Sequence, residues 1–205
     1  MKVILVNGSP NRNGSTNRAL EEIKAEFDKT NIEAYIFWIG DRLSGCTGCN
    51  QCVKYGRCVF DDKVNEFGEL AKDCSGVIFG SPVYYASANG SMVSFLDRVF
   101  RSFSKYLEYK PGATISVARR AGTLSTFDQL NKYLMINSMP VVSSQYWNGV
   151  HGANANDIES DLEGLQTMRT LARNMIWLLE SIEAGKKAGV NLPKKEERVR
   201  TNFIR

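Results

Sequence analysis

The sequence lacks the features of a membrane, secreted or nucleic-acid-binding protein. The apolar run after Lys2 is only four residues long before Asn7 and Gly8, and no other apolar run could span a bilayer. The net charge is only +4, and much of it comes from the tail beyond Lys186, as on a solvated or subunit-contacting surface. We therefore expect a cytoplasmic protein, with neither a membrane nor a nucleic acid as its partner.

The cysteines do not form the pattern of a disulfide framework. There are five of them, an odd number, and four lie between Cys46 and Cys58. Without a secretion signal, this clustering favours reduced thiols or a metal site. The chain has 205 residues, of which 43% are apolar and 23% charged, and it shows no internal repeat or linker. We expect a single globular domain over 1–205.

Two common phosphate-binding motifs are also missing from the amino-terminal segment. The apolar run 3–6 predicts a central strand, and the following segment 8–16 is rich in Gly, Ser, Asn and Thr. It lacks the lysine of a nucleotide-triphosphate loop and the third glycine of the dinucleotide fingerprint. Ser15 and Thr16 are expected to cap a helix from about Asn17. What remains is either a loop that holds a phosphomonoester, such as that of FMN, or an ordinary capped turn.

The rest of the chain alternates expected strands with expected helices. Strands are expected at 32–39, 76–80, 113–118 and near 140–142. Helices are expected over 17–29, 62–73, 92 to about 107, from after 122 to about 137, and over 157–183. The last of these helices is expected to have Leu162 among its inward residues. The region 40–61 is expected to be irregular. Short links between alternating strands and helices predict an α/β fold with a parallel sheet covered on both faces.

Five segments in chain order resemble the flavodoxin-like NAD(P)H-dependent FMN reductases. They read GSPNRNGST, CTGCNQCVKYGRC, GSPVYYASANGSMVSFLDR, SVARRAG and QYWNGVHG. Within that group they are most similar to the iron–sulfur flavoproteins. The resemblance implies a doubly wound five-stranded parallel sheet in the order 2-1-3-4-5. It also implies FMN as cofactor and homodimers or homotetramers that complete the flavin site between subunits.

The resemblance also implies which residues bind the flavin. The residues that match the family's phosphate loop are Ser9, Asn11, Gly14, Ser15 and Thr16. The segment that matches the lining of the isoalloxazine contains Pro82, Val83, Tyr84 and Tyr85. A further flavin loop is matched by Ala118, Arg119 and Ala121. In a doubly wound sheet these three loops meet at one edge, beside the switch point. Tyr84 and Tyr85 are expected to offer an aromatic face, unless they plug the sheet edge or a subunit contact instead.

Arg119 helps to distinguish a flavoenzyme that accepts hydride from a flavoprotein that only carries electrons. A guanidinium beside the ring stabilises the negative charge of a reduced flavin, which favours hydride acceptance from NAD(P)H. The alternative is that Arg119 and Arg120 are two surface residues of a turn. His151, the one histidine, lies in a Gly-rich segment and is given no catalytic role; we assign no catalytic residue.

The cysteine loop, 40–61, carries Cys46, Cys49, Cys52 and Cys58. The C-x2-C-x2-C spacing is that of ferredoxin ligands, and it suits a zinc site less well. The resemblance implies a [4Fe–4S] cluster on these four thiolates. A loop that keeps its cysteines without a metal is the alternative. Cys74 is expected to be a buried structural thiol.

The sequence thus predicts an FMN-dependent oxidoreductase. It would take hydride from NAD(P)H, or electrons from a ferredoxin-like donor, and reduce a small acceptor such as a quinone, free flavin or oxygen. The alternative is an electron-transfer iron–sulfur flavoprotein with no nicotinamide site. The tail over 184–205 ends in PKKEERVRTNFIR, which suits an arm that packs on another protomer, or a frayed end.

Overall fold

The computed structural model describes residues 1–197, 199–201 and 203. Its sheet contains five parallel strands in the order β2-β1-β3-β5-β6, and the two-residue β4 pairs antiparallel with the end of β3. The bounds are β1 Lys2–Asn7, β2 Glu33–Trp38, β3 Gly76–Tyr84, β4 Ser87–Ala88, β5 Gly112–Ala118 and β6 Gly149–His151. Without the short β4, this is the predicted order 2-1-3-4-5, so the flavodoxin-like fold is confirmed.

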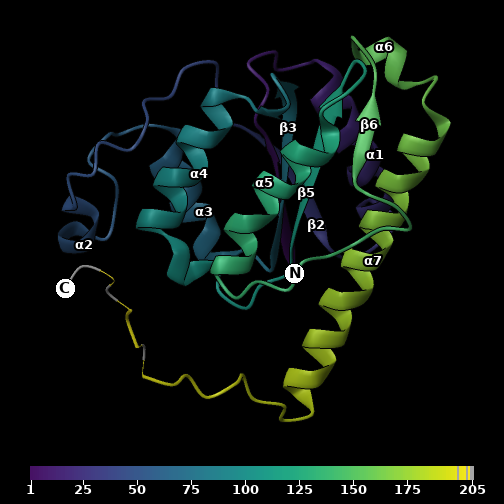
Figure 1. The fold of residues 1–205 in the computed structure, drawn as a ribbon. Coiled ribbons are helices and arrows are strands. Elements are labelled where there is room, and N and C mark those ends of the chain that lie inside the picture. Colours follow the sequence, from purple (N-terminus) through teal and green to yellow (C-terminus); the bar gives the residue numbers. More distant parts are fainter. Residues whose placement is uncertain (198, 202, 204–205) are drawn as a thin grey trace.

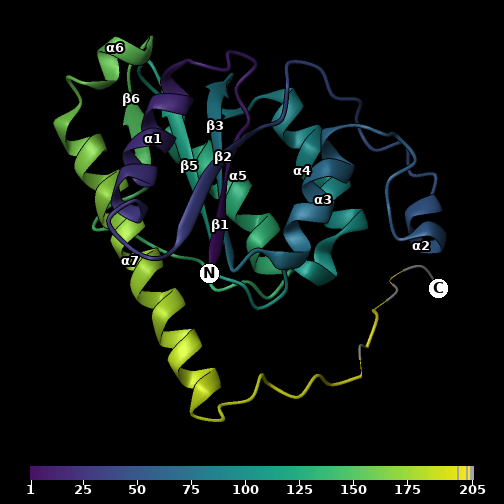
Figure 2. The same ribbon diagram turned by 180° about the vertical axis from the view of Figure 1, so that it is seen from behind.

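Helices cover both faces of this sheet (Figures 1 and 2). Their bounds are α1 Ser15–Phe27, α2 Gln51–Tyr55, α3 Lys63–Asp73, α4 Gly90–Ser102, α5 Thr123–Ile136, α6 Ala155–Ile158 and α7 Leu162–Lys187, with a 3-10 turn at Ser104–Tyr106. One core cluster joins α1 and α7 to the sheet through residues such as Leu20 and Met175. The other joins α3, α4 and α5 to the opposite face, for example through Phe67 and Phe95.

The alternation of side chains along the central strands explains the two cores. Val3 and Leu5 point into the first cluster, and Ile4 and Val6 point into the second. All four are fully buried, as the continuous apolar run predicted. β1 lies between β2 and β3, so its carboxyl end delivers the following loop to the middle of the sheet edge.

The fifth strand was predicted in the wrong place. Residues 140–142 form only an isolated bridge between Gly112 and Val141, whereas the strand beside β5 is β6, at Gly149–His151. Proline has no N–H to donate, so a ladder cannot continue through Pro140. The true strand is three residues long and begins with glycine, and so short a strand leaves almost no periodic signal in the sequence.

Three helix predictions were also inaccurate. α1 begins at Ser15 with Gly14 as its N-cap and no side-chain cap, so Ser15 and Thr16 do not cap it. The last predicted helix is divided into α6 and α7, and Leu162 is 73% exposed at the start of α7 instead of facing the core. The cysteine loop, predicted to be irregular, contains the short helix α2.

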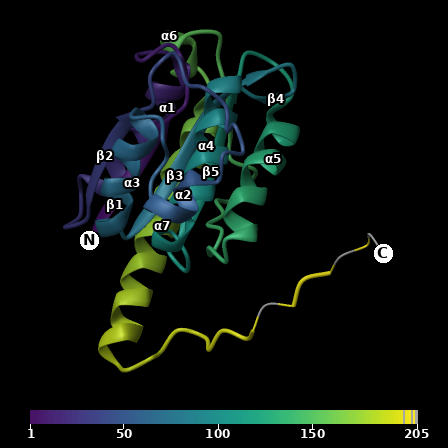
Figure 3. The ribbon, with the colours of Figure 1, turned by 90° about the vertical axis from the view of Figure 1, so that its left-hand side faces the viewer.

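After α7 the chain runs on without helix or strand through the described part of the tail (Figure 3). One ion pair, between Lys195 and Glu108, connects it to the body of the protein. Arg198, Asn202, Ile204 and Arg205, which the predicted arm included, lie outside the described residues. Across the residues that the structure describes, no helix combines the length and the apolar character needed to cross a membrane.

Candidate functional site

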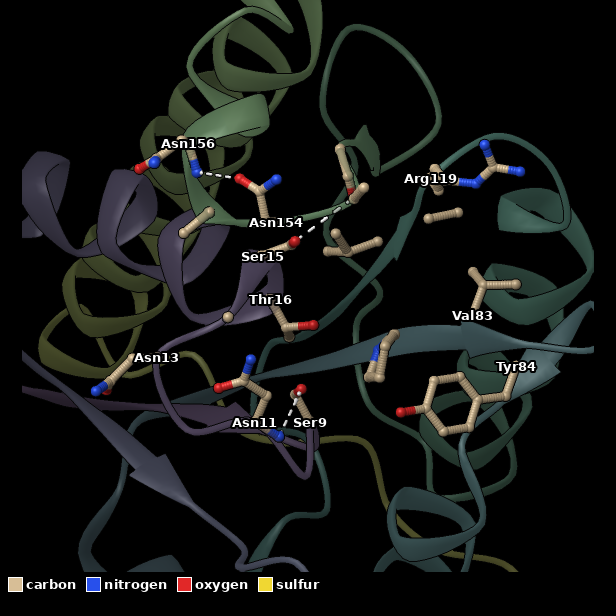
Figure 4. A pocket seen from close by; sticks show the side chains of 17 residues that line it. Ser9, Asn11, Asn13, Ser15, Thr16, Val83, Tyr84, Arg119, Asn154 and Asn156 are labelled. Carbon is tan, nitrogen blue, oxygen red and sulfur yellow. Dashed lines mark hydrogen bonds between the residues drawn. The ribbon is translucent and has the colours of Figure 1, made fainter.

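A cavity of about 580 Å³ opens where the loops after β1, β3, β5 and β6 meet (Figure 4). Ten of the twelve predicted cofactor residues line it: Ser9, Asn11, Gly14, Ser15, Thr16, Pro82, Val83, Tyr84, Ala118 and Arg119. The loop before α1 forms one side of the cavity, and Val83, Tyr84 and Arg119 lie opposite (Figure 4). Tyr85 and Ala121 are not part of the lining. The structure therefore brings together residues from all three predicted loops.

Sequence reasoning missed one wall of this cavity. The segment from Gly152 to Asn156, after β6, closes the side beside α1, and Asn13 and Val117 also contribute. The hydroxyl of Ser15 donates to the carbonyl of Gly152 at 3.4 Å, which links this wall to the start of α1. The sequence feature that could have identified this wall is the repeated asparagine, because asparagine is a common helix N-cap. Asn154 caps α6 by accepting hydrogen bonds from the backbone N–H groups of Asn156 and Asp157.

The first loop is held in shape by Asn7, which is fully buried at the end of β1. Its side-chain oxygen accepts from the backbone N–H of Ser9 at 3.0 Å, and its amide donates to the carbonyl of Arg12 at 3.0 Å. A Cβ on Gly8 would lie 2.9 Å from the carbonyl oxygen of Gly80 and 2.8 Å from the sulfur of Met92. Only glycine allows this approach, so the turn that leads to α1 depends on Gly8.

The loop ends at the open amino end of α1. The N-cap is Gly14, no side chain caps the helix, and the first turn contains no acidic residue. The first N–H groups of a helix have no acceptor within the helix, and the helix dipole places partial positive charge there. Among the other helices, α3, α4, α6 and α7 are each capped by an Asp or Asn side chain, whereas α2 and α5 also have no side-chain cap. The amino end of α1 therefore suits an anion such as a phosphate.

The opposite side of the cavity is formed by the end of β3 and the tight hairpin to β4. Tyr85 and Ala86 have φ values of 51° and 57°, the left-handed conformation of a two-residue hairpin turn. The turn is held by the Ser125 hydroxyl, which donates to the carbonyl of Ala86 at 2.7 Å. This geometry turns Tyr85 outward, fully exposed to solvent, and leaves Tyr84 alone to provide the aromatic face.

Arg119 is the one charged residue among the 17 described residues that line the cavity. The loop that carries it packs on the hairpin: a Cβ on Gly122, at φ 89°, would lie 2.9 Å from both Ala86 and Val83. Arg119 is exposed, and Arg120 does not line the cavity. A cavity with no carboxylate and one guanidinium is favourable for a ligand that carries a phosphate.

The four predicted metal ligands, Cys46, Cys49, Cys52 and Cys58, line a separate cavity of only about 20 Å³. Within the described part of the chain, no three His, Cys, Asp or Glu side chains are gathered closely enough to hold a single metal ion. A [4Fe–4S] cluster makes a different demand, because each thiolate binds its own iron. The donor set fits such a cluster, but the exposed part of the loop would have to open to admit it.

A buried arginine of α4 organises this cysteine cavity. The Arg98 side chain is 1% exposed and donates to both carboxylate oxygens of Asp62, each at 2.8 Å. Its Nε donates to the sulfur of Cys58 at 3.3 Å, and its guanidinium also donates to the carbonyls of Ser44 and Phe60. Arg98 therefore connects both ends of the cysteine loop to one helix. Sequence reasoning did not identify it.

The cysteines differ in acidity because their surroundings differ. The pKa of Cys49 is lowered by hydrogen bonds from the backbone N–H of Gln51 and, to a smaller extent, from the side chain of Thr47. Burial instead raises the pKa of Cys74, which is 4% exposed and bonds to the carbonyl of Ala71. Cys74 is thus the buried thiol that was predicted.

The residues Tyr146, Trp147, Gly149 and His151 line a different cavity from the one shown in Figure 4. The backbone N–H of His151 donates to Asp161, and its Nδ1 lies 3.7 Å from the same carboxylate. His151 therefore lines this second cavity and not the main one.

Comparison with known proteins places this geometry in a family. Residues 1–154 match the family model described as NADPH-dependent FMN reductase. An iron–sulfur flavoprotein of Methanocaldococcus jannaschii is 30% identical over 192 residues, covering 89% of this chain and 100% of the relative. An iron–sulfur flavoprotein of Methanosarcina thermophila is 28% identical over 191 residues, covering 89% and 97%.

A solved structure shows the same fold. The apo form of an NADH:FMN oxidoreductase superposes with a TM-score of 0.63 and 17% identity, covering 88% of this chain and 89% of that one. The family match spans the loop after β1, the end of β3 and the loop after β5, and it reaches the wall after β6. The chain therefore belongs to the NADPH-dependent FMN reductase family, a family of flavin-dependent redox proteins.

Proposed function

We propose that the cavity of Figure 4 binds FMN and that the protein oxidises NAD(P)H and reduces a small acceptor. The observation that carries this proposal is the uncapped amino end of α1, which opens into a cavity with no carboxylate in its lining. Bound FMN supplies the ring that accepts a hydride and passes electrons on. The acceptor class we propose is a quinone, free flavin or oxygen.

The residues of the cavity have separable roles in this proposal. The backbone N–H groups of Ser15 and Thr16, with the hydroxyls of the same loop, hold the phosphate. Tyr84 and the backbone around Val83 contact the flat ring, and Arg119 stabilises the negative charge of its reduced form. Hydride transfer needs no protein acid, so no side chain is assigned as catalytic. Membership of the NADPH-dependent FMN reductase family supports a nicotinamide as the electron source.

A homodimer or homotetramer that completes the site is part of the proposal. Tyr85 is fully exposed beside the cavity, and Leu162 is 73% exposed at the start of α7. Large apolar side chains left exposed to water are typical of a subunit contact. A second copy of the chain seated there would cover one side of the bound ring.

The second candidate is an electron-transfer protein with a [4Fe–4S] cluster on Cys46, Cys49, Cys52 and Cys58. Two observations favour it: the four thiols line one cavity, and both relatives described above are named iron–sulfur flavoproteins. In this role the electrons would come from a ferredoxin-like donor, and the protein would need no nicotinamide site.

One anaerobic experiment separates these functions. The protein is purified without oxygen, its iron and FMN are measured, and it is mixed with NADPH or NADH in a stopped-flow spectrometer. We expect rapid bleaching of the flavin absorbance band. About four irons per chain, with no bleaching by either nicotinamide, would favour the relay instead. A preparation that contains no flavin and takes up none in a titration would contradict both functions.

Arg119→Gln is expected to lower the midpoint potential of the bound flavin by about 20 mV, because an exposed charge contributes about 1 kcal/mol and the couple transfers two electrons. Arg120→Gln is the matched control, since its side chain does not line the cavity. The potentials are measured by equilibration with reference dyes. If both variants shift the potential equally, the effect comes from net charge, and Arg119 has no specific role.

A further inference from the structure

A second cavity, of about 230 Å³, lies beside the ends of β5 and β6, next to the flavin-binding cavity. Ser116 of β5 and His151 of β6 line it, whereas Val117 and Ala118 of β5 and Gly152, just after β6, line the first cavity. The two cavities share no lining residue. β6 is the last strand of the sheet, and it lies between α5 and α7 (Figure 1). Residues at the starts of α5 and α7 complete the lining of this second cavity.

A buried hydroxyl in the wall of this cavity has no partner. Ser116 is 0% exposed, and within the described structure its Oγ forms no hydrogen bond. A buried polar atom without a partner costs roughly 1–3 kcal/mol, so such atoms are rare in folded proteins. The neighbouring buried hydroxyl on the same strand, Thr114, is satisfied by Asn131 at 2.8 Å. The Ser116 hydroxyl thus retains an unused hydrogen-bonding capacity in the wall of this cavity.

The other walls suit an aromatic ring. Phe127, Tyr146 and Trp147 all line the cavity, and the rings of Tyr146 and Trp147 pack edge to face with centroids 4.6 Å apart. Trp147 is still 51% exposed, so one of its faces is open. Aromatic side chains attract a further ring by stacked or edge-to-face contact, each worth roughly 0.5–1.5 kcal/mol beyond the buried area.

The charges around the cavity exclude anions. Asp161 and Glu163 both line it, and no lysine or arginine does. The Asp161 carboxylate accepts from the backbone N–H groups of His151 at 2.6 Å and Gly164 at 2.9 Å, which fixes its position in the wall. The two carboxylates disfavour an anionic ligand, and the aromatic walls favour a ligand without charge. The cavity, at about 230 Å³, is somewhat larger than the roughly 150 Å³ that takes one benzene ring.

We propose that this second cavity binds a small uncharged aromatic molecule of one or two rings that carries a hydroxyl or carbonyl group. The ring lies against Trp147 and its neighbours, and the oxygen bonds the hydroxyl of Ser116. The site is separate from the flavin-binding cavity, and it does not depend on the function proposed above.

Phenol is the probe that tests this site, and toluene and benzoate are its comparators. Binding is measured by titration calorimetry on the protein as purified, with the flavin absorbance followed in parallel. We expect phenol to bind saturably, Ser116→Ala to weaken it about tenfold through the lost hydrogen bond, and benzoate not to bind. Toluene should bind the wild type and Ser116→Ala equally, because it has no hydroxyl.

Thr126→Val is the matched control. Thr126 carries another buried hydroxyl without a partner in the described structure, and it lies on α5 but does not line this cavity. This variant should bind phenol like the wild type. The indole N–H resonance of Trp147 should shift with phenol while those of Trp38 and Trp177 stay in place. No saturable binding, equal affinity in Ser116→Ala and wild type, or a phenol-induced change in the flavin band would each overturn the proposal.

Discussion

Replacing Ser15 with aspartate should weaken FMN binding by about 100-fold while leaving riboflavin binding nearly unchanged. Ser15 is the first residue of α1 and lines the cavity beside the uncapped amino end. A carboxylate there would lie close to the position proposed for the phosphate. Two like charges about 4 Å apart near a protein surface repel by about 4 kcal/mol, and solvent screening leaves about 2–3 kcal/mol. That range corresponds to about 100-fold in affinity.

The same substitution should not harm the folded apoprotein. An acidic residue in the first turn of a helix is stabilising by about 0.3–1 kcal/mol, and α1 has none at present. The substitution also removes the bond from the Ser15 hydroxyl to the Gly152 carbonyl, which offsets this gain. We therefore expect a nearly unchanged melting temperature together with the loss of FMN. Ser15→Asn is the matched control, because it has the shape of aspartate without the charge.

The measurement is a titration of each apoprotein with FMN and with riboflavin, followed by the quenching of flavin fluorescence. Riboflavin lacks the phosphate, so it reports on the ring contacts alone. Equal losses of FMN and riboflavin in Ser15→Asp would show that the phosphate is not held at α1. An unchanged FMN affinity would remove the amino-terminal loop from the binding site altogether.

The parts of this site that the sequence predicted are those specified by local chemistry. The buried run Val3 to Val6 identifies a central strand, and the hydroxyl-rich segment after it indicates a loop that leads into a helix. The carboxyl ends of parallel strands share one edge, so the loops after β1, β3 and β5 had to meet. Ten of the predicted residues line one cavity for this reason.

The parts that the sequence did not predict depend on tertiary contacts. Tyr85 and Tyr84 are adjacent and chemically alike, but the left-handed turn at Tyr85 and Ala86 turns one outward and the other toward the cavity. The wall from Gly152 to Asn156 follows a strand of only three residues, which has too few positions to show alternation. Such features depend on contacts with neighbouring strands and helices, and a single segment of the sequence does not reveal those contacts.

Arg98 is another residue whose role depends on a tertiary contact, in this case on a helix. It lies within the apolar stripe of α4, next to Val99 and three residues after Phe95, and a charged residue there would ordinarily be assigned to the solvent face. The partner that makes its burial tolerable, Asp62, is 36 residues away in the sequence. No periodicity of α4 itself could have revealed that pairing.

Helix α4 contacts both the loop after β1 and the cysteine loop. The amide of its N-cap, Asn89, donates to the carbonyl of Gly8 at 2.8 Å, in the loop proposed to hold the phosphate. Arg98, nine residues and about 14 Å further along the helix, holds the cysteine loop. One helix thus connects the cavity of Figure 4 with the cysteine loop.

Arg98→Met should destabilise the protein by about 3 kcal/mol and release the cysteine loop. Methionine keeps the packing of the side-chain stem but leaves the Asp62 carboxylate without its partner. Removing one member of a buried ion pair costs about 3–5 kcal/mol, and we take the lower end because Asp62 is 30% exposed. In a chain of this size the melting temperature should fall by about 6–12 °C.

The released loop gives a second measurement that is more local. Lys54 and Arg57 lie within it and are exposed, so trypsin should cut Arg98→Met there faster than the wild type. Arg101→Met is the matched control on the same helix. Its guanidinium is exposed and bonds the side chain of Asn50, a contact worth less than about 1 kcal/mol. If the two variants melt and are cut alike, Arg98 does not organise the loop.

A double-mutant cycle with Asp62→Asn isolates the pair itself. Asparagine can still accept the hydrogen bond from the backbone N–H of Val64 that caps α3, so the variant removes the charge and keeps the cap. If the cost of Arg98→Met comes from the abandoned carboxylate, it should shrink by about 2 kcal/mol in the Asp62→Asn background. An undiminished cost would instead assign the effect to the bonds that Arg98 makes with Cys58, Ser44 and Phe60, and the cysteine loop would then be held by its backbone and thiol rather than by an ion pair.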